Sequence, residues 1–115
     1  MDDRLAKALE QANYSVAIQT QKRNLRLAFT NALTFGHNGG TFVASEKLIS
    51  FIDALLRADN GSEVVIDERG NPVMIDDLSA FYLRVVETYR TAANEFYAGY
   101  EKLRRARTTK AAVGV

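Results

Sequence analysis

Apolar positions recur with helical spacing along most of this chain. In the segment 20–33, the apolar residues stand at i, i+3, i+4, i+7 and i+8: Leu25, Ala28, Phe29, Ala32 and Leu33. This pattern is typical of an amphipathic helix. Over residues 77–106 apolar side chains keep the same phase for roughly seven to eight turns. The sequence therefore predicts helices over 20–33 and 77–106, the second capped by Asp76.

A third helix, predicted over residues 45–58, has the widest apolar surface. Its apolar positions cover roughly 220° of the helix circumference. Ser45 is the expected N-cap, and Asn60-Gly61 is the expected stop signal. Because helices with so wide an apolar surface are usually buried on most sides, we expect this one at the centre of the core.

The first 20 residues allow two interpretations. Leu5, Leu9 and Ala12 are spaced i, i+4, i+7, which favours a helix. The alternation of Tyr14, Val16 and Ile18 instead suits a short strand. Val16 also continues the earlier stripe, so a single long helix remains open as the alternative.

The β structure is predicted from two short apolar runs, residues 64–66 and 73–75, joined by a turn. Gly70 would supply a positive φ in a type I turn, and Pro72 belongs at an edge or at a strand's start. Residues 34–35 and 42–43 can add a third strand. The expected fold is α+β and mostly helical: a central buried helix and a long C-terminal helix packed with a small two- or three-stranded antiparallel sheet. We expect one domain over residues 1–107 and a flexible tail over 108–115.

Composition excludes several kinds of chemistry. The 115 residues include no cysteine and one histidine, which excludes disulfides, cysteine zinc sites and two-histidine metal motifs. No apolar run approaches the roughly 20 residues of a membrane span, and the acidic start does not resemble a secretory signal. The acidic residues between 59 and 77 do not match a calcium loop and are expected to be caps and turn residues. We expect no cofactor, no metal and no enzymatic activity.

The length of the last helix favours association. Roughly thirty residues span about 45 Å, whereas a compact domain of this size is roughly 34 Å across. Either another segment, such as the N-terminal helix, or a second subunit must cover the aromatic overhang. The candidate interface residues are Tyr89, Phe96, Tyr97, Tyr100 and Leu103, and the expected partner is a second copy of the chain.

Charge is unevenly distributed along the chain. Residues 1–44 carry a net charge of +2, residues 45–77 of −5 and residues 78–115 of +4. Such a chain can stack head to tail, unless the fold interleaves the segments and cancels the asymmetry. The basic C-terminal cluster can bind nucleic acid or, as we favour, complement the helix dipole; it comprises Lys102, Arg104, Arg105, Arg107 and Lys110.

The glycine-rich stretch of residues 36–40, GHNGG, lacks the following helix and lysine of a phosphate-binding loop. We predict a tight turn with positive φ at Asn38, Gly39 or Gly40, and with His37 hydrogen-bonding the turn. A binding loop formed by His37 and Asn38, or a catalytic role for His37, is the less favoured alternative.

Three segments together resemble a family of small uncharacterised proteins of large contractile-tailed phages of marine bacteria, including cyanobacteria. They are LTFGHNGGTF (33–42), NPVMIDDL (71–78) and NEFYAGYEKL (94–103), and the resemblance covers residues 13–107. It implies a phage-encoded virion or assembly component, located in the virion or the host cytoplasm, with other assembly proteins as further partners. The expected function is a non-enzymatic structural or assembly role through self-association. The alternative is a regulator that binds nucleic acid or a host protein.

Overall fold

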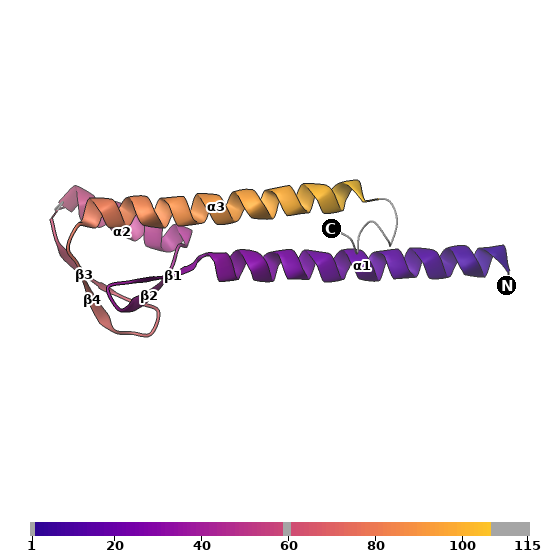
Figure 1. Ribbon diagram of the computed structural model, residues 1–115, viewed down its shortest axis with the longest axis horizontal. Coiled ribbons are helices and arrows are strands. Elements are labelled where there is room, and N and C mark those ends of the chain that lie inside the picture. Colours follow the sequence, from indigo (N-terminus) through magenta and orange to yellow (C-terminus); the bar gives the residue numbers. More distant parts are fainter. Residues whose placement is uncertain (1, 59–60, 107–115) are drawn as a thin grey trace. The chain divides into compact units, whose positions relative to one another are not determined.

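The computed structural model describes residues 2–58 and 61–106. These residues form α1 (Asp3–Ala32), β1 (Thr34–His37), β2 (Gly40–Val43), α2 (Glu46–Ala58), β3 (Glu63–Ile66), β4 (Pro72–Ile75) and α3 (Leu78–Arg105), as Figure 1 shows. The strands make two separate antiparallel sheets of two strands each. The predicted class, a mostly helical α+β fold with a long C-terminal helix, is confirmed.

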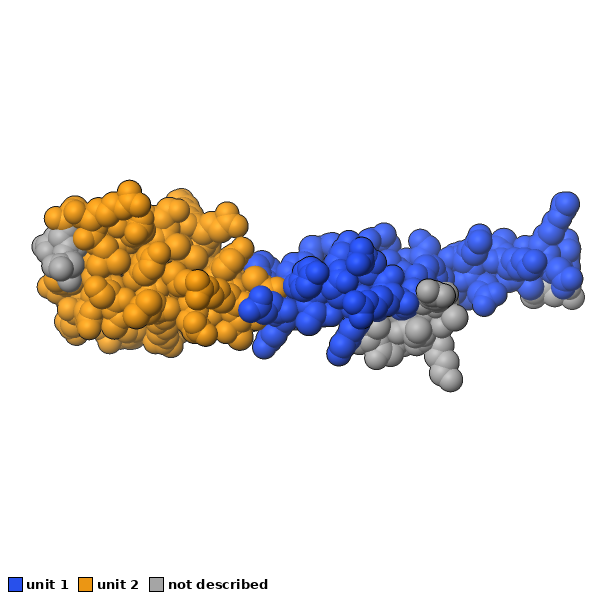
Figure 2. All heavy atoms as spheres, turned by 90° about the horizontal axis from the view of Figure 1, so that it is seen from above, with its two compact units in different colours: residues 1–29, 94–115 blue, residues 30–93 orange. Residues whose placement is uncertain are grey.

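The chain divides into two compact units, coloured separately in Figure 2. Unit 1 comprises Met1–Phe29 and Asn94–Val115, and unit 2 comprises Thr30–Ala93. Helices α1 and α3 each contribute to both units. The sequence predicts one domain over residues 1–107, whereas the structure contains these two units. The predicted tail, residues 108–115, lies outside the described residues.

The N-terminal segment is one continuous helix, so the alternative of a strand at residues 14–18 is wrong. Within unit 1, α1 packs along α3 (Figure 1), and the helical spacing of Tyr14, Ala17 and Ile18 turns all three toward that helix. In a strand, Ala17 would point away from its two neighbours. Packing against α3 therefore selects the helix.

Unit 1 has a small core. Its buried described residues are Ala17, Leu103 and Ala106, with Tyr14, Ile18 and Leu25 packed against them. The rings of Phe29 and Phe96 lie 5.1 Å apart between centroids. The Tyr14 hydroxyl donates a hydrogen bond of 2.6 Å to the Ala106 carbonyl. Gly99 allows close approach, because a Cβ there would lie 2.6 Å from Leu25 Cδ2.

Unit 2 contains both hairpins. The β1–β2 turn has positive φ at Asn38 (48°) and Gly39 (80°), as the sequence predicts, and two such residues suit a two-residue hairpin turn. In the β3–β4 hairpin Gly70 has φ 80° and Pro72 begins β4, which confirms both predictions. Residues 34–35 and 42–43 do not extend this sheet; they belong to the separate β1–β2 hairpin.

The core of unit 2 forms around Phe81 of α3. Its ring lies 5.1 Å from that of Phe42 and 6.0 Å from that of Phe35. The other fully buried side chains of the described part of unit 2 include Ile52, Val65, Ile75, Leu78 and Val85. The prediction that the helix over 45–58 is central is wrong, because Ile52 is the only fully buried residue of α2. Two short hairpins and α3 offer too little surface to cover an apolar arc of roughly 220°.

The helix caps follow local hydrogen-bond chemistry. Ser45 Oγ accepts a 3.1 Å hydrogen bond from the Leu48 N–H, which confirms the predicted cap of α2. For α3 the prediction is off by one residue: Asp77, not Asp76, accepts from the Ala80 N–H at 3.0 Å. Helix α3 begins at Leu78, so Asp77 holds the position from which a carboxylate reaches the third N–H of the helix.

Asp67 connects the two hairpins of unit 2. Its buried carboxylate accepts hydrogen bonds from the N–H groups of Thr41 (2.9 Å), Asn71 (2.8 Å) and Arg69 (3.0 Å). These bonds, that of Thr41 above all, lower the pKa of Asp67 although burial opposes them. The charged form is therefore the one that stabilises the fold.

Replacing Asp67 with asparagine should lower the melting temperature at pH 7 by roughly 5–10 °C. A neutral amide cannot accept from donors on both of its sides. Because folding lowers the carboxyl pKa, its contribution is present above the unfolded pKa and is lost as pH falls through the folded value. The gap between wild type and variant, followed by circular dichroism, should therefore shrink below about pH 4.

Asp53→Asn is the matched control for this prediction. Asp53 pairs with Arg57 on the surface of α2 at 2.9 Å, and such pairs contribute little. Equal melting temperatures for the two variants at pH 7 would contradict the role assigned to Asp67.

Candidate functional site

Two tyrosines of α3 are exposed on unit 1. Tyr97 is 67% exposed and Tyr100 is 40% exposed. They stand three residues apart, so they are neighbours on one side of the helix. Lys22 Nζ lies 6.0 Å from the centroid of the Tyr100 ring, at the outer limit of a cation–π contact. Tyr97, Tyr100, Lys22 and Arg104 are called the tyrosine surface below.

A small pocket lies beside Tyr100. It has a volume of about 150 Å³ and is lined by Tyr14, Ile18, Lys22, Tyr100, Leu103 and Arg104. Small-molecule sites usually measure about 300–1,000 Å³, so this pocket suits a single side chain. Its lining combines apolar groups with two cations. That chemistry fits a protein partner with an apolar or acidic side chain.

The other predicted interface residues are partly covered within the chain. Leu103 is 1% exposed and belongs to the core of unit 1, and Phe96 is half-buried against Phe29. Tyr89 is half-buried in unit 2, with its hydroxyl 3.4 Å from Glu46 Oε1. The N-terminal helix thus covers part of the aromatic stripe, which is one of the two alternatives left by the sequence. Tyr97 and Tyr100 remain at the surface.

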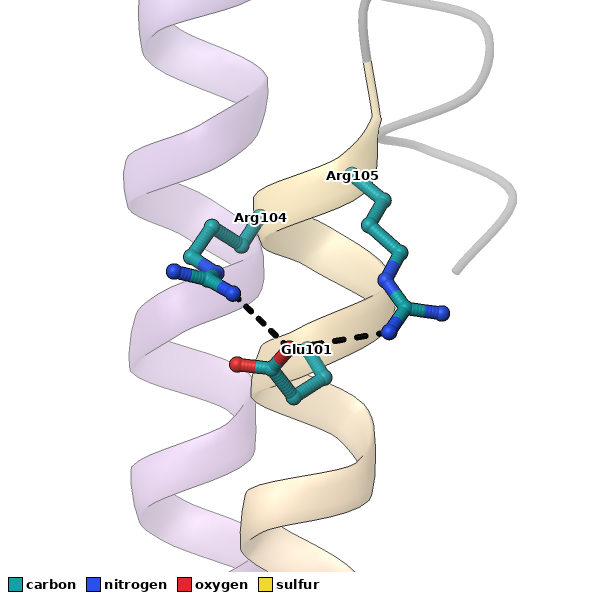
Figure 3. A network of polar contacts seen from close by, with 3 residues as sticks. All are labelled: Glu101, Arg104 and Arg105. Atoms are coloured by element: carbon teal, nitrogen blue, oxygen red, sulfur yellow. Dashed lines mark hydrogen bonds and ion pairs between the residues drawn. The ribbon is translucent and has the colours of Figure 1, made fainter.

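The basic cluster at the end of α3 is partly neutralised. Arg104 and Arg105 both reach Glu101 Oε2, at 3.1 and 3.9 Å, as Figure 3 shows. Exposed ion pairs of this kind contribute little stability, but a carboxylate between two guanidinium groups opposes phosphate binding there. Lys102 is exposed. The remaining candidates, Arg107 and Lys110, lie outside the described residues.

The fold separates charge between the units. Residues 1–29 and 94–115 hold ten basic and five acidic side chains, so unit 1 has a net charge of +5. Residues 30–93 hold five basic and nine acidic side chains, so unit 2 has a net charge of −4. The two basic ends of the chain are brought into one unit, and the acidic segment of residues 45–77 lies wholly in the other.

Unit 2 has an open apolar groove between α2 and β3. It has a volume of about 290 Å³ and is lined by Ser45, Lys47, Leu48, Phe51, Val64, Val65, Ile66 and Glu68. Phe51 is 48% exposed and Ile66 is 60% exposed. Val64 pairs with Met74 across the hairpin, and both are exposed. Sequence reasoning missed this groove, although a continuous apolar run in a two-stranded sheet signals one uncovered face.

The His37 side chain packs against helix α3. Its Nδ1 lies 3.2 Å from Arg84 Nη1, and its ring centroid lies 4.9 Å from that of Phe81. Burial and the charge of Arg84 lower the pKa of His37, against the opposing charge of Asp76. Because a guanidinium only donates, Nδ1 accepts and the proton of the neutral ring is on Nε2. The predicted hydrogen bond to the turn is replaced by this contact with α3.

Asn38, the second residue of the proposed binding loop, is also engaged within unit 2. Its Nδ2 donates a 2.9 Å hydrogen bond to the Met74 carbonyl. This bond ties the β1–β2 turn to β4. His37 therefore fixes the β1–β2 hairpin to α3, and Asn38 fixes it to β4.

Comparisons with other proteins find no relative: no family model, curated protein or solved structure matches the chain. Within residues 2–58 and 61–106, no three His, Cys, Asp or Glu side chains gather as metal ligands would. No helix of this described part is both long and apolar enough to cross a membrane. Function is therefore inferred from the surface chemistry of the two units.

Proposed function

We propose that the protein is a non-enzymatic structural or assembly protein that associates with further copies of itself through the tyrosine surface. One observation carries this proposal. The described part of unit 1 fully buries one large side chain, Leu103, while Tyr97 and Tyr100 stay exposed. A pair of helices with so small a core is typical of a unit that buries further apolar surface against a partner.

Tyrosine suits this role physically. Its ring contributes a large apolar area while its hydroxyl finds a polar partner, and tyrosine is enriched at protein interfaces. Lys22 and Arg104 line the pocket beside Tyr100 and add positive charge, which Glu101 offsets in part at Arg104. Such charge orients a partner and speeds encounter. Together these groups combine an aromatic anchor with a basic rim.

The resemblance to proteins of contractile-tailed phages gives the setting that we propose for this activity. A component of a virion, or of an assembly in the host cytoplasm, acts through protein contacts that repeat from copy to copy. Other assembly proteins would then be further partners. The tyrosine surface is the contact that we assign to the chain itself.

The test is the replacement of Tyr97 with aspartate. This change places a charge at the centre of the proposed contact and should weaken association at least about tenfold, as removal of an interface hot spot does. By light scattering the variant should have the 12.8 kDa mass of one chain at concentrations where wild type is larger. Its helix content by circular dichroism should be unchanged.

Leu83→Asp is the matched control. Leu83 lies on the same helix and is exposed to almost the same extent, at 68%. It should keep the wild-type mass. If Tyr97→Asp also keeps the wild-type mass, the tyrosine surface is not the contact.

A further inference from the structure

We propose that the groove between α2 and β3 receives the tyrosine surface of a second copy, so that the copies associate head to tail. The inference rests on the proposed function and adds the partner surface. It commits to one occupant of the groove, unit 1 of another chain. Charge, apolar surface and hydrogen-bonding groups each support this pairing.

Charge complementarity is the first argument. Unit 1 has a net charge of +5 and unit 2 a net charge of −4. The groove is lined by residues between 45 and 68. They belong to the acidic segment 45–77, which carries eight acidic and three basic side chains. A contact between unit 1 and unit 2 of different copies joins opposite charges, whereas a contact between two copies of unit 1 joins charges of the same sign.

The apolar surfaces also match. The groove presents Phe51 and aliphatic side chains of β3 that remain exposed within the chain, including Ile66. Its volume of about 290 Å³ admits an aromatic side chain. The Tyr97 side chain of α3 is 67% exposed, so most of it is uncovered within the chain. Burying both surfaces together removes them from water.

The polar groups of the groove meet the requirement that a buried tyrosine hydroxyl finds a hydrogen-bond partner. Ser45, Lys47 and Glu68 line the groove together with the apolar side chains. Glu68 also offers a carboxylate to the cations of the tyrosine surface, Lys22 and Arg104. These groups would fix orientation more than they add affinity.

The symmetry of such a contact differs from that of an ordinary dimer. The two surfaces belong to different units of one chain, so each bound copy still has one free groove or one free tyrosine surface. Contacts of this heterologous kind produce closed rings or open filaments. A face-to-face dimer through the exposed stripe of α1, Leu5, Leu9 and Val16, would instead stop at two copies.

Two variants that each lose one surface provide the test. Tyr97→Asp removes the tyrosine surface and keeps the groove. Ile66→Glu disrupts the groove and keeps the tyrosines. If Ile66→Glu loses the circular dichroism signal of the folded chain, Phe51→Glu is used as the groove variant instead. Each variant alone should be a monomer of 12.8 kDa. An equimolar mixture should form a dimer of twice that mass and nothing larger, because one intact contact remains.

Three outcomes would each contradict one part of this account: the docking site, the head-to-tail arrangement or self-association itself. If Ile66→Glu and Phe51→Glu keep the wild-type mass, the groove is not the docking site, although self-association through the tyrosines still stands. If each variant is a monomer but the mixture stays monomeric, both positions belong to one face-to-face contact and head-to-tail association is wrong. If wild type itself is a monomer throughout, the proposed function fails.

Discussion

Replacing Phe81 with alanine should lower the free energy of unfolding by about 3–5 kcal/mol, the usual cost of truncating a buried aromatic residue. Phe81 is 1% exposed, and its ring contacts Phe35, His37 and Phe42 from both strands of the first hairpin. Truncation to alanine removes all three ring contacts and leaves a cavity in the core of unit 2. Urea denaturation followed by circular dichroism measures the loss.

Phe51→Ala is the matched control, because it removes the same ring from a half-exposed position of α2. We expect it to cost less than about 1 kcal/mol of stability, and to reduce self-association instead. If the two phenylalanine variants lost equal stability, α2 would have to be as buried as the sequence pattern suggested, and the groove would not be open.

The replacement of Leu103 with alanine should lower the free energy of unfolding by about 2–5 kcal/mol. Leu103 is the largest fully buried side chain among the described residues of unit 1, where it packs with Ala17 and Ala106. Its removal leaves a cavity that two alanines cannot close. Thermal and urea denaturation at a fixed protein concentration would measure the effect, since association also contributes stability.

Leu27→Ala on α1 is the control for Leu103. Leu27 is exposed, and alanine is the better helix former, so this change should be nearly neutral. If Leu103→Ala cost no more than Leu27→Ala, the packing of α1 on α3 in unit 1 would be wrong.

The sequence predicted those parts of the fold that are determined by local chemistry. Helical spacing predicted α2 and α3, Gly70 and Pro72 predicted the β3–β4 hairpin, and Asn38-Gly39 predicted a turn with positive φ. Each signal reflects a local backbone preference, which depends on the residue itself and on its near neighbours in the sequence.

Predictions that required knowledge of packing were less accurate. The apolar arc of α2 indicated a buried helix, but burial depends on how much surface the hairpins offer, which periodicity does not contain. The strand interpretation of residues 14–18 was wrong because contacts with Leu103 and Ala106, far along the chain, favour helix there. The cap of α3 differed by one residue, because adjacent Asp76 and Asp77 are equally suitable as caps.

The candidate site was predicted in part. The sequence identified Tyr97 and Tyr100, and it detected opposite charges along the chain. It could not show that both basic segments belong to one unit, because that grouping depends on residues 1–29 and 94–115 coming together. The groove was missed because the run Val64-Val65-Ile66 does not show which face of a short hairpin is left uncovered.

Solution mass of the wild-type chain, measured by light scattering across a concentration and salt series, tests self-association most directly. We expect a mass above 12.8 kDa that rises with concentration. It should fall as salt screens the opposite charges of the two units. A mass of 12.8 kDa at every concentration up to the high micromolar range would contradict self-association.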